Sequence, residues 1–272
     1  MKNRDTAKGI GVVRFHDGKL HAAERDEAAV EEPLEIRIEG QSIAVVMRTP
    51  GHDRELAAGF VLTEGIVRDS ADIFEITSCL TTGETAGNGI DITLADPGKF
   101  DLAKLSRHVF SSSSCGICGK ATIEAAMQPF PPITAAPRVT AQVLLQLPAK
   151  LAAAQQTFQR TGGLHACALF DPAGELLLLR EDVGRHNALD KLIGHQLLAQ
   201  QIPLGNSILL LSGRVSFEMT QKALAAGIAI IAAISAPTSL AIEFALANRQ
   251  TLIGFLRGQT MNVYAGAERI TR

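Results

Sequence analysis

The segment Val215–Ile234 reads VSFEMTQKALAAGIAIIAAI, and it decides the fold class of this chain. Its first part, Val215–Ala226, has apolar residues at helical spacing and therefore predicts a helix. Its second part, Ile228–Ile234, is almost continuously apolar. A run of this kind is typical of a strand that is buried on both faces of a parallel sheet. We therefore expect a helix that crosses over a sheet and leads into a strand in its interior.

Strands and helices alternate on both sides of this segment. The expected strands are Leu164–Phe170, Leu176–Arg180, Ser207–Leu211, Thr251–Leu256 and Met261–Tyr264, and the expected helices are Asn187–Gln200, Ser239–Ala247 and one capped by Thr140. This alternation predicts crossover units, which place helices on both faces of a largely parallel sheet. The back half of the chain is therefore predicted to be an α/β domain.

The first hundred residues follow another pattern. Alternating apolar residues over Pro33–Met47, interrupted at Gly40, predict a hairpin. Glu55–Leu62 has helical spacing, and Asp53 stands where a helix cap is expected. Two more strands are expected at Ile73–Cys79 and Gly89–Leu94. These elements predict a small α+β unit in front of the α/β domain.

The composition excludes several classes of function. A net charge of -2 removes the usual electrostatic reason to expect nucleic acid as a partner, and the absence of Trp with a single Tyr leaves few rings for stacking bases. The longest apolar stretch, Ala223–Ile234, is shorter than the roughly 20 residues of a membrane helix. The N-terminus has no apolar core of a signal peptide. Four cysteines are too few for a disulfide framework in a chain of 272 residues. We expect a soluble cytoplasmic protein that binds neither nucleic acid nor membranes.

The pair Cys115 and Cys118 is the sharpest chemical feature. It forms a CxxC with Gly116 in a serine-rich loop, just before a predicted helix and beside Lys120. A helix N-terminus and a nearby cation both favour the thiolate, which is the nucleophilic form of cysteine. Three interpretations fit the spacing: half of a zinc site or a chance pair, a thioredoxin-like redox pair, and a carrier of persulfide sulfur. A zinc site needs four ligands and a thioredoxin motif ends a first strand, and the sequence provides neither context.

Two polar segments stand at predicted strand-to-helix junctions. Arg180–Lys191 is dense in polar side chains, and Leu211–Ser216 offers a glycine, an arginine and two hydroxyls before a helix. Such junctions collect ligands in α/β folds, and the second has groups that suit a phosphate. Surface capping and salt bridges would explain both segments equally well. The roles of Arg185, His186 and Arg214 stay open at this stage.

Several motifs, in order along the chain, make a family resemblance specific. The matching segments are Glu31–Leu34, Glu55–Ile66, Cys115–Gly119, Glu181–Lys191, Ser216–Lys222 and Leu252–Phe255. In these segments the sequence resembles the formate dehydrogenase accessory sulfurtransferase family. The resemblance implies a sulfur carrier that accepts persulfide sulfur from a cysteine desulfurase. It also implies that the sulfur passes to the bis-molybdopterin guanine dinucleotide molybdenum cofactor, which formate dehydrogenase then needs for its activity.

The same resemblance implies roles for individual residues. Cys115 corresponds to the persulfide carrier and Cys118 to the second cysteine of the pair. The guanine-dinucleotide segment corresponds to Phe255, Leu256, Arg257, Gly258, Gln259 and Thr260, with GDP as a mimic of the bound end. A homodimer is implied as well. The resemblance also implies a fold like that of the cytidine deaminases, which bind zinc. A zinc deaminase needs His-x-Glu before Pro-Cys-x-x-Cys, and His165-Ala166-Cys167 lacks the glutamate. No metal is therefore expected.

We therefore predict an α/β protein in three parts. A smaller α+β domain covers residues 1–108, and the CxxC loop covers 109–120. The larger α/β domain covers 121–272, and the family resemblance implies that it is a cytidine-deaminase-like three-layer sandwich. The main alternative is a non-enzymatic chaperone that binds the cofactor and formate dehydrogenase without moving sulfur. A more distant alternative is an unrelated nucleotide-binding α/β enzyme.

Overall fold

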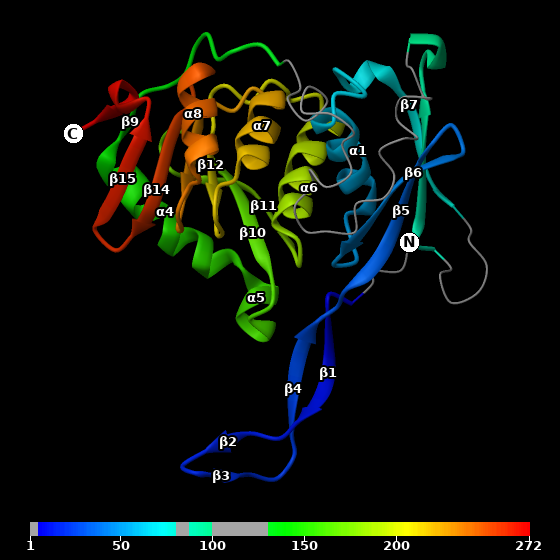
Figure 1. Cartoon of the computed structure of the whole chain (residues 1–272), viewed down its shortest axis with the longest axis vertical. Helices are drawn as coiled ribbons and strands as arrows, with labels where there is room; N and C mark the ends of the chain where they lie inside the picture. The colour runs from blue at the N-terminus through cyan, green and yellow to red at the C-terminus, as the bar shows by residue number, and fades with distance from the viewer. Residues whose placement is uncertain (1–4, 80–86, 100–129) are drawn as a thin grey trace.

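A computed structural model describes residues 5–79, 87–99 and 130–272 of the chain. Figure 1 shows two sheets joined by a layer of helices, with a thin arm that projects from the body. The expected loop over 109–120 and the expected domain boundaries at 108 and 120 lie outside the described residues.

The larger sheet has six strands in the order β11-β10-β12-β13-β14-β15. These strands are β10 (His165–Phe170), β11 (Leu176–Asp182), β12 (Ile208–Leu211), β13 (Ile230–Ala233), β14 (Thr251–Arg257) and β15 (Thr260–Ala265). Only β12–β13 and β13–β14 pair in parallel, and the other three pairings are antiparallel. The expectation of a largely parallel sheet was therefore wrong. Short turns at Asp171–Gly174 and at Gly258 leave no room for crossovers, so each joins its two strands as an antiparallel hairpin.

Both faces of this sheet are buried, as the apolar strand predicted. In β12, Leu209 and Leu211 belong to one hydrophobic cluster, whereas Ile208 and Leu210 belong to another. Helix α4 (Ala141–Ala154) contributes leucines to the second cluster. Helices α6 (Arg185–Leu198), α7 (Phe217–Ala225) and α8 (Ser239–Ala247) contribute to the first. Three layers result, with helices on both faces of the six-stranded sheet (Figure 1).

The smaller sheet has the order β6-β5-β8-β7 and is covered by helix α1 (Asp53–Thr63). Its strands are β5 (Glu32–Ile38), β6 (Gln41–Arg48), β7 (Ile73–Cys79) and β8 (Gly89–Leu94). The β5–β6 hairpin turns at Gly40, as expected. The expected cap of α1 is wrong: His52 is the N-cap, and Asp53 is the first helical residue.

Helices α1 and α6 join the two sheets into one body. They cross at Gly59 and Gly194, where the backbones approach so closely that a Cβ on Gly59 would lie 1.9 Å from the Asp190 carbonyl oxygen. A Cβ on Gly194 would likewise lie 1.8 Å from the Glu55 carbonyl oxygen. Only glycine permits this crossing. The hydrophobic cluster of α1 is therefore continuous with that of α6.

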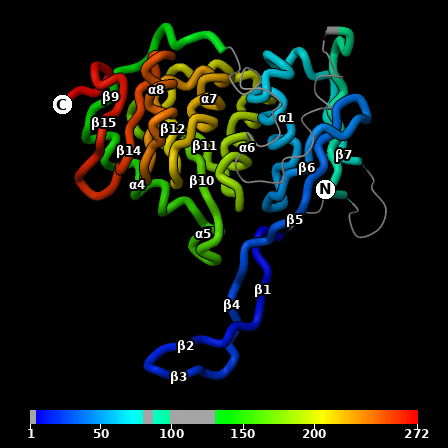
Figure 2. The backbone as a smooth tube through the Cα atoms, viewed as in Figure 1, coloured from blue at the N-terminus to red at the C-terminus, as the bar shows by residue number. Residues whose placement is uncertain are grey.

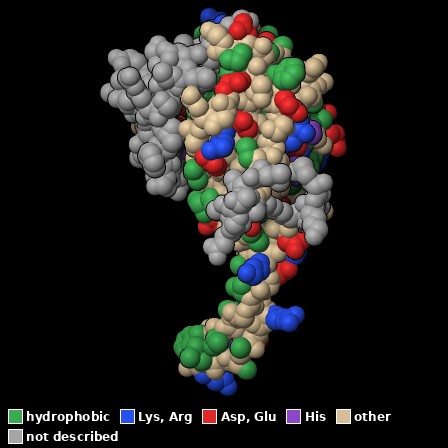
Figure 3. Space-filling model, turned by 90° about the vertical axis from the view of Figure 1, so that its right-hand side faces the viewer, with side chains coloured by type: hydrophobic (Ala, Val, Ile, Leu, Met, Phe, Trp, Pro, Cys, Tyr) green, Lys and Arg blue, Asp and Glu red, His purple; other side chains and the backbone are tan. Residues whose placement is uncertain are grey.

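The arm is a two-stranded ribbon that extends away from the body (Figure 2). Strand β1 (Ala7–Val12) pairs with β4 (Glu24–Ala29), and β2 (Phe15–His16) pairs with β3 (Lys19–Leu20) at the tip. At its base, Glu27 forms an ion pair with Arg160 of α5 (Gln156–Thr161). Apolar side chains gather at the tip, where Phe15 and Leu20 are 69% and 70% exposed (Figure 3).

The remaining elements are short. Strands β9 (Val139–Thr140) and β16 (Ile270–Thr271) pair in parallel. Three 3-10 turns, η1 (Ser70–Asp72), η2 (Pro97–Lys99) and η4 (Ala267–Arg269), complete the described elements. The Thr140 side chain accepts a hydrogen bond from the Val143 amide, so the expected cap of α4 is confirmed. Among the described helices, none is both long and apolar enough to cross a membrane.

Candidate functional site

The two cysteines of the CxxC, Cys115 and Cys118, lie outside the described residues. The other two cysteines, Cys79 and Cys167, lie within the described residues. Cys167 in β10 is 1% exposed, and burial, followed by the nearby carboxylates of Asp190 and Asp182, raises the pKa of its thiol. Burial and then Asp91 raise the pKa of Cys79. Because the thiolate is the nucleophile, neither environment activates its sulfur.

The predicted nucleotide-binding segment surrounds the turn between β14 and β15. Gly258 at this turn has a φ of 57°, and the residues from Arg257 to Thr260 are exposed. The Arg257 guanidinium lies 5.5 Å from the ring centre of Phe255. Leu256 is different, because its side chain is fully buried in the same cluster as the leucines of α4. The segment therefore offers an exposed turn that one buried side chain anchors.

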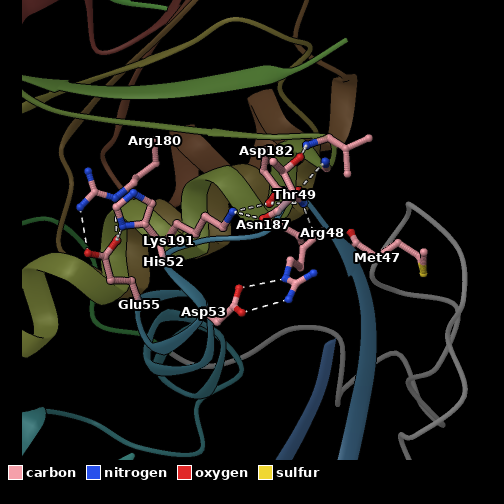
Figure 4. Close-up of polar contacts among 12 residues, drawn as sticks. Met47, Arg48, Thr49, His52, Asp53, Glu55, Arg180, Asp182, Asn187 and Lys191 are labelled. Atoms are coloured by element: carbon pink, nitrogen blue, oxygen red, sulfur yellow. Dashed lines mark hydrogen bonds and ion pairs between the residues drawn. The ribbon is translucent and has the colours of Figure 1, made fainter. Parts of the chain in front are cut away.

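After β11, the side chains of Asp182, Asn187 and Lys191 form polar contacts that join the larger domain to the end of β6 in the smaller sheet (Figure 4). We call this set of contacts the latch. Asp182 and Lys191 are fully buried, and Lys191 Nζ lies 2.6 Å from Asp182 Oδ2. The same carboxylate accepts hydrogen bonds from the amide of Thr49 and from Asn187 Nδ2. Lys191 also donates to the Thr49 carbonyl, and Asn187 to the carbonyl of Met47. These three side chains of the polar segment therefore hold the end of β6 against α6.

Arg48 extends this latch into the smaller sheet. Its guanidinium is fully buried and donates to both carboxylate oxygens of Asp53, at 2.9 and 3.0 Å (Figure 4). It also contacts Glu32 and Asn88. A bidentate, charge-assisted pair of this kind has a well-defined geometry. The start of α1 is therefore held in place by Asp53, although this residue is not the cap.

A second polar cluster surrounds Glu55 of α1. Arg180 donates to both of its carboxylate oxygens, and His52 and His195 lie within 3.2 and 3.0 Å of them. Burial alone would raise the pKa of Glu55, but the hydrogen bonds from His52, Arg180 and His195 outweigh it and hold this pKa well below its ordinary value. The charged form of Glu55 therefore stabilises the folded chain.

This cluster predicts a dependence of stability on acid. Because the pKa of Glu55 is depressed in the folded chain, its stabilising contribution is complete above its ordinary pKa of 4.5 and is lost as the pH falls below it. We expect the urea midpoint of the wild type to fall more between pH 5 and pH 3 than that of Glu55→Gln. Glu75→Gln, on β7, is the control and should fall like the wild type. If the urea midpoints of the wild type and of Glu55→Gln fall by the same amount between pH 5 and pH 3, the prediction is contradicted.

The two polar junctions meet between the N-termini of α6 and α7. His186 Nε2 lies 2.8 Å from Glu218 Oε2, an ion-pair distance at which the ring N–H is not aligned for a hydrogen bond. Five buried polar atoms here have no hydrogen-bond partner in the described part of the chain: Arg185 Nε, His186 Nε2, Ser216 Oγ, Glu218 Oε1 and Gln221 Nε2. Buried polar atoms without partners are rare in folded proteins, and a bound group is one explanation for them.

His165 lies beside this cluster, at the start of β10. Gly213 stands so close that a Cβ there would be 3.3 Å from His165 Nδ1. Burial, and then the positive charges of Arg185 and His186, lower the pKa of His165. Cationic side chains and two helix N-termini together suit an oxyanion. The roles of Arg185, His186 and Arg214 were left open by the sequence. All three lie close enough to His165 to lower its pKa.

The strand ends bring these features to one edge of the larger sheet. Strands β12, β13 and β14 are parallel, so Leu211, Ala233 and Arg257 end at the same edge. The cluster near His186 and the turn at Gly258 therefore lie along that edge, separated in the sheet order by β13. Ligands of α/β proteins bind outside the carboxyl ends of strands.

Sequence reasoning missed several residues of this edge. Glu218 and Gln221 were not singled out as site residues, although both interrupt the apolar face of α7 and are mostly buried. A buried charge or amide on a helix is a signal that sequence alone carries only weakly, because burial must be known first. His165 was considered only as part of a metal motif. Its place beside Arg185 follows from the antiparallel pairing of β10 with β11.

The fold defines a mixed α/β protein in which polar groups gather at the strand ends of the larger sheet. Comparison with known proteins is more specific. The sequence model of the FdhD/NarQ family matches residues 29–271, and the chain belongs to this family.

Relatives resemble the chain over most of its length. A Streptomyces coelicolor protein described as a sulfur carrier protein FdhD is 48% identical over 269 residues, which cover 95% of this chain and 94% of the relative. Proteins with the same description are 49% identical in Mycobacterium tuberculosis, over 89% of this chain and 91% of theirs, and 42% identical in Saccharolobus solfataricus, over 97% and 98%.

A crystal structure of a Desulfotalea psychrophila protein, proposed to be a formate dehydrogenase accessory protein, has a similar fold. The TM-score is 0.75 at 24% identity, and the match covers 98% of this chain and 100% of the other.

Proposed function

We propose that this chain is a sulfurtransferase that carries sulfur as a persulfide on Cys115. It accepts the sulfur from a cysteine desulfurase and passes it to the bis-molybdopterin guanine dinucleotide form of the molybdenum cofactor, its substrate, for use by formate dehydrogenase. Family membership and the description of the relatives as sulfur carrier proteins support this proposal.

The main support for the proposal is that neither of the described cysteines is activated as a nucleophile. A carrier sulfur must be nucleophilic and must reach two partners in turn. Cys167 is walled off in β10, and the pKa values of both Cys167 and Cys79 are raised. Among the four cysteines, only Cys115 and Cys118 stand in a CxxC with neighbouring glycines and a lysine. The sulfur chemistry is therefore assigned to this pair.

The proposed chemistry balances in two steps. The Cys115 thiolate attacks the terminal sulfur of the donor's persulfide, the donor's S–S bond breaks, and the donor cysteine leaves as a thiolate. In the second step the Cys118 thiolate attacks the inner sulfur of the Cys115 persulfide. Hydrosulfide leaves for the cofactor, and a Cys115–Cys118 disulfide forms, which takes up the oxidation. A dithiol reductant returns the pair to thiols.

The edge of the larger sheet is proposed to hold the nucleotide ends of the substrate. The exposed turn from Arg257 to Thr260 offers backbone and side-chain groups, and GDP should mimic the bound end. The cationic cluster of Arg185, His186 and Arg214 suits the phosphates. Leu256 contributes only as an anchor, since its side chain is fully buried.

Two finer features belong to the same proposal. The larger domain is proposed to be a cytidine-deaminase-like sandwich, which its three layers support. A homodimer is proposed as well, and the exposed Phe15 and Leu20 on the arm support it, because an isolated two-stranded ribbon with an apolar tip is marginally stable in water. In the described ranges, no group of three or more His, Cys, Asp or Glu could hold a metal ion.

A double Cys115→Ala and Cys118→Ala variant separates a carrier from a chaperone. In cells that lack their own copy of this protein, we expect the wild type to restore formate dehydrogenase activity and the double variant to leave it at background. Cys79→Ala is the matched control and should restore activity fully. Full activity with the double variant would favour the chaperone, which binds the cofactor without moving sulfur.

A further inference from the structure

A shallow pocket of about 420 Å³ lies between helix α4 and the turn that joins β14 to β15. Its lining consists of Gln142, Leu145, Gln146 and Gln259. The first three residues come from α4, and Gln259 stands at the turn. None of the residues on α4 was singled out from the sequence. The pocket thus joins the predicted nucleotide-binding segment to a helix more than a hundred residues away.

The helix and the turn are held together by the core beneath them. Leu256 is fully buried in one cluster with Leu144 and Leu147 of α4, so the turn cannot move away from the helix without exposing this leucine. Gln142 and Gln146 are four residues apart, and residues at this spacing lie on one face of a helix. Both amides are exposed and face the same opening as Gln259.

The chemistry of the lining selects a class of ligand. Each glutamine amide offers two donors and one acceptor oxygen, and the lining contains no charged residue. The charged side chains that most often bind phosphates and metal ions are absent from this lining. A planar ring whose edge alternates donors and acceptors matches the three amides, and Leu145 supplies an apolar surface for its face. Nucleobases have this pattern, and proteins read their edges through such hydrogen bonds.

We infer that this pocket binds the nucleobase of a nucleotide, and that Gln142 and Gln146 determine specificity together with Gln259. The inference rests on the proposed function, which makes guanine the base concerned. It goes further by assigning the recognition of the base to α4 and by separating this recognition from the cationic cluster near His186.

Calorimetric titration of the full chain with GDP, ADP and inorganic pyrophosphate tests the inference. We expect a Gln142→Ala and Gln146→Ala double variant to bind GDP about tenfold or more weakly than the wild type, because two hydrogen bonds are lost. Its affinity for pyrophosphate should not change. The preference of the wild type for GDP over ADP should shrink in the double variant. Gln156→Ala, an exposed glutamine of α5 outside the pocket, should bind like the wild type.

Three outcomes would overturn the inference: GDP binding by the double variant at wild-type strength, an equal loss of pyrophosphate binding, or no GDP binding by the wild type. Persulfide loading of Cys115, followed by mass spectrometry in the same samples, keeps the two proposals apart. If loading persists while the nucleotide results fail, only the base pocket is wrong. If the wild type carries no persulfide, the proposed function itself fails.

Discussion

A Cys115→Ala variant is expected to gain no sulfur after incubation with a cysteine desulfurase and cysteine, whereas the wild type gains the mass of one sulfur atom. The loss should be large, because neither of the two described cysteines, Cys79 and Cys167, is activated. Burial raises the pKa of Cys167 and of Cys79, so their thiolate populations at neutral pH are below that of an ordinary cysteine. Intact-mass measurement with and without a reductant checks the result, since a persulfide is reducible.

Matched variants separate the roles of the cysteines. Cys79→Ala should load sulfur like the wild type. Cys118→Ala should also load, but it should release hydrosulfide slowly, because the proposed attack on the inner sulfur is missing. GDP binding by Cys115→Ala should equal that of the wild type, which shows that the fold is intact. Full loading of Cys115→Ala would remove the assignment of the carrier.

The second large effect is expected on stability, from the latch around Asp182. Asp182→Ala should lower the free energy of unfolding by about 3–5 kcal/mol, because it leaves the ammonium of Lys191 buried without its carboxylate. Lys191 is 1% exposed and lies 2.6 Å from Asp182, so its charge stays buried within the contact between β6 and α6 when the carboxylate is removed. Urea unfolding followed by circular dichroism measures the difference.

Two further variants test whether the loss of stability comes from the buried charge of Lys191. Glu175→Ala removes the carboxylate that pairs with Lys150, but Glu175 is 73% exposed, so we expect a loss of less than about 1 kcal/mol. A double Asp182→Ala and Lys191→Met variant removes both charges and should recover part of the lost stability. If Asp182→Ala is no less stable than Glu175→Ala, the latch does not hold the two halves together.

The pair of Lys222 and Asp190 is a second buried ion pair between α6 and a neighbouring helix. Lys222 Nζ lies 2.8 and 3.0 Å from the two oxygens of Asp190 and also contacts Thr63 of α1. Burial lowers the pKa of Lys222, but the carboxylates of Asp190 and Glu64 outweigh it and raise this pKa. Asp190 and Lys191 are adjacent in α6 and turn to different partners. The polar segment therefore serves the assembly of three helices and a strand.

Much of the local structure could be predicted from the sequence. The hairpin that turns at Gly40, the Thr140 cap and the strand buried on both faces all follow from patterns within a few residues. The cap of α1 could not be predicted in the same way. Asp53 has the residue type of a cap, but the guanidinium of Arg48 pairs with its carboxylate and leaves His52 at the N-cap. A pattern of residue types cannot anticipate a competing partner that the fold provides.

The candidate site, too, could be predicted only in part from local sequence. Sequence alone singled out Arg180–Lys191 and Leu211–Ser216. It could not tell which of their side chains hold the fold together and which are available to bind a ligand. The structure assigns Asp182, Asn187 and Lys191 to the latch, while His186 faces Glu218 of α7. This division depends on contacts between residues that lie far apart along the chain, which the local pattern does not contain.

By itself, the amino-acid sequence determined the class of the fold, most of the elements and, through motifs in a fixed order, the family to which the chain belongs. These properties follow from periodicity and residue type, which are local. The tertiary structure alone decided that three of the five pairings in the larger sheet are antiparallel, that Cys167 is buried, and that glutamines of α4 line one pocket with Gln259. Each of these depends on which distant segments pack together, because burial and pairing are properties of the folded core.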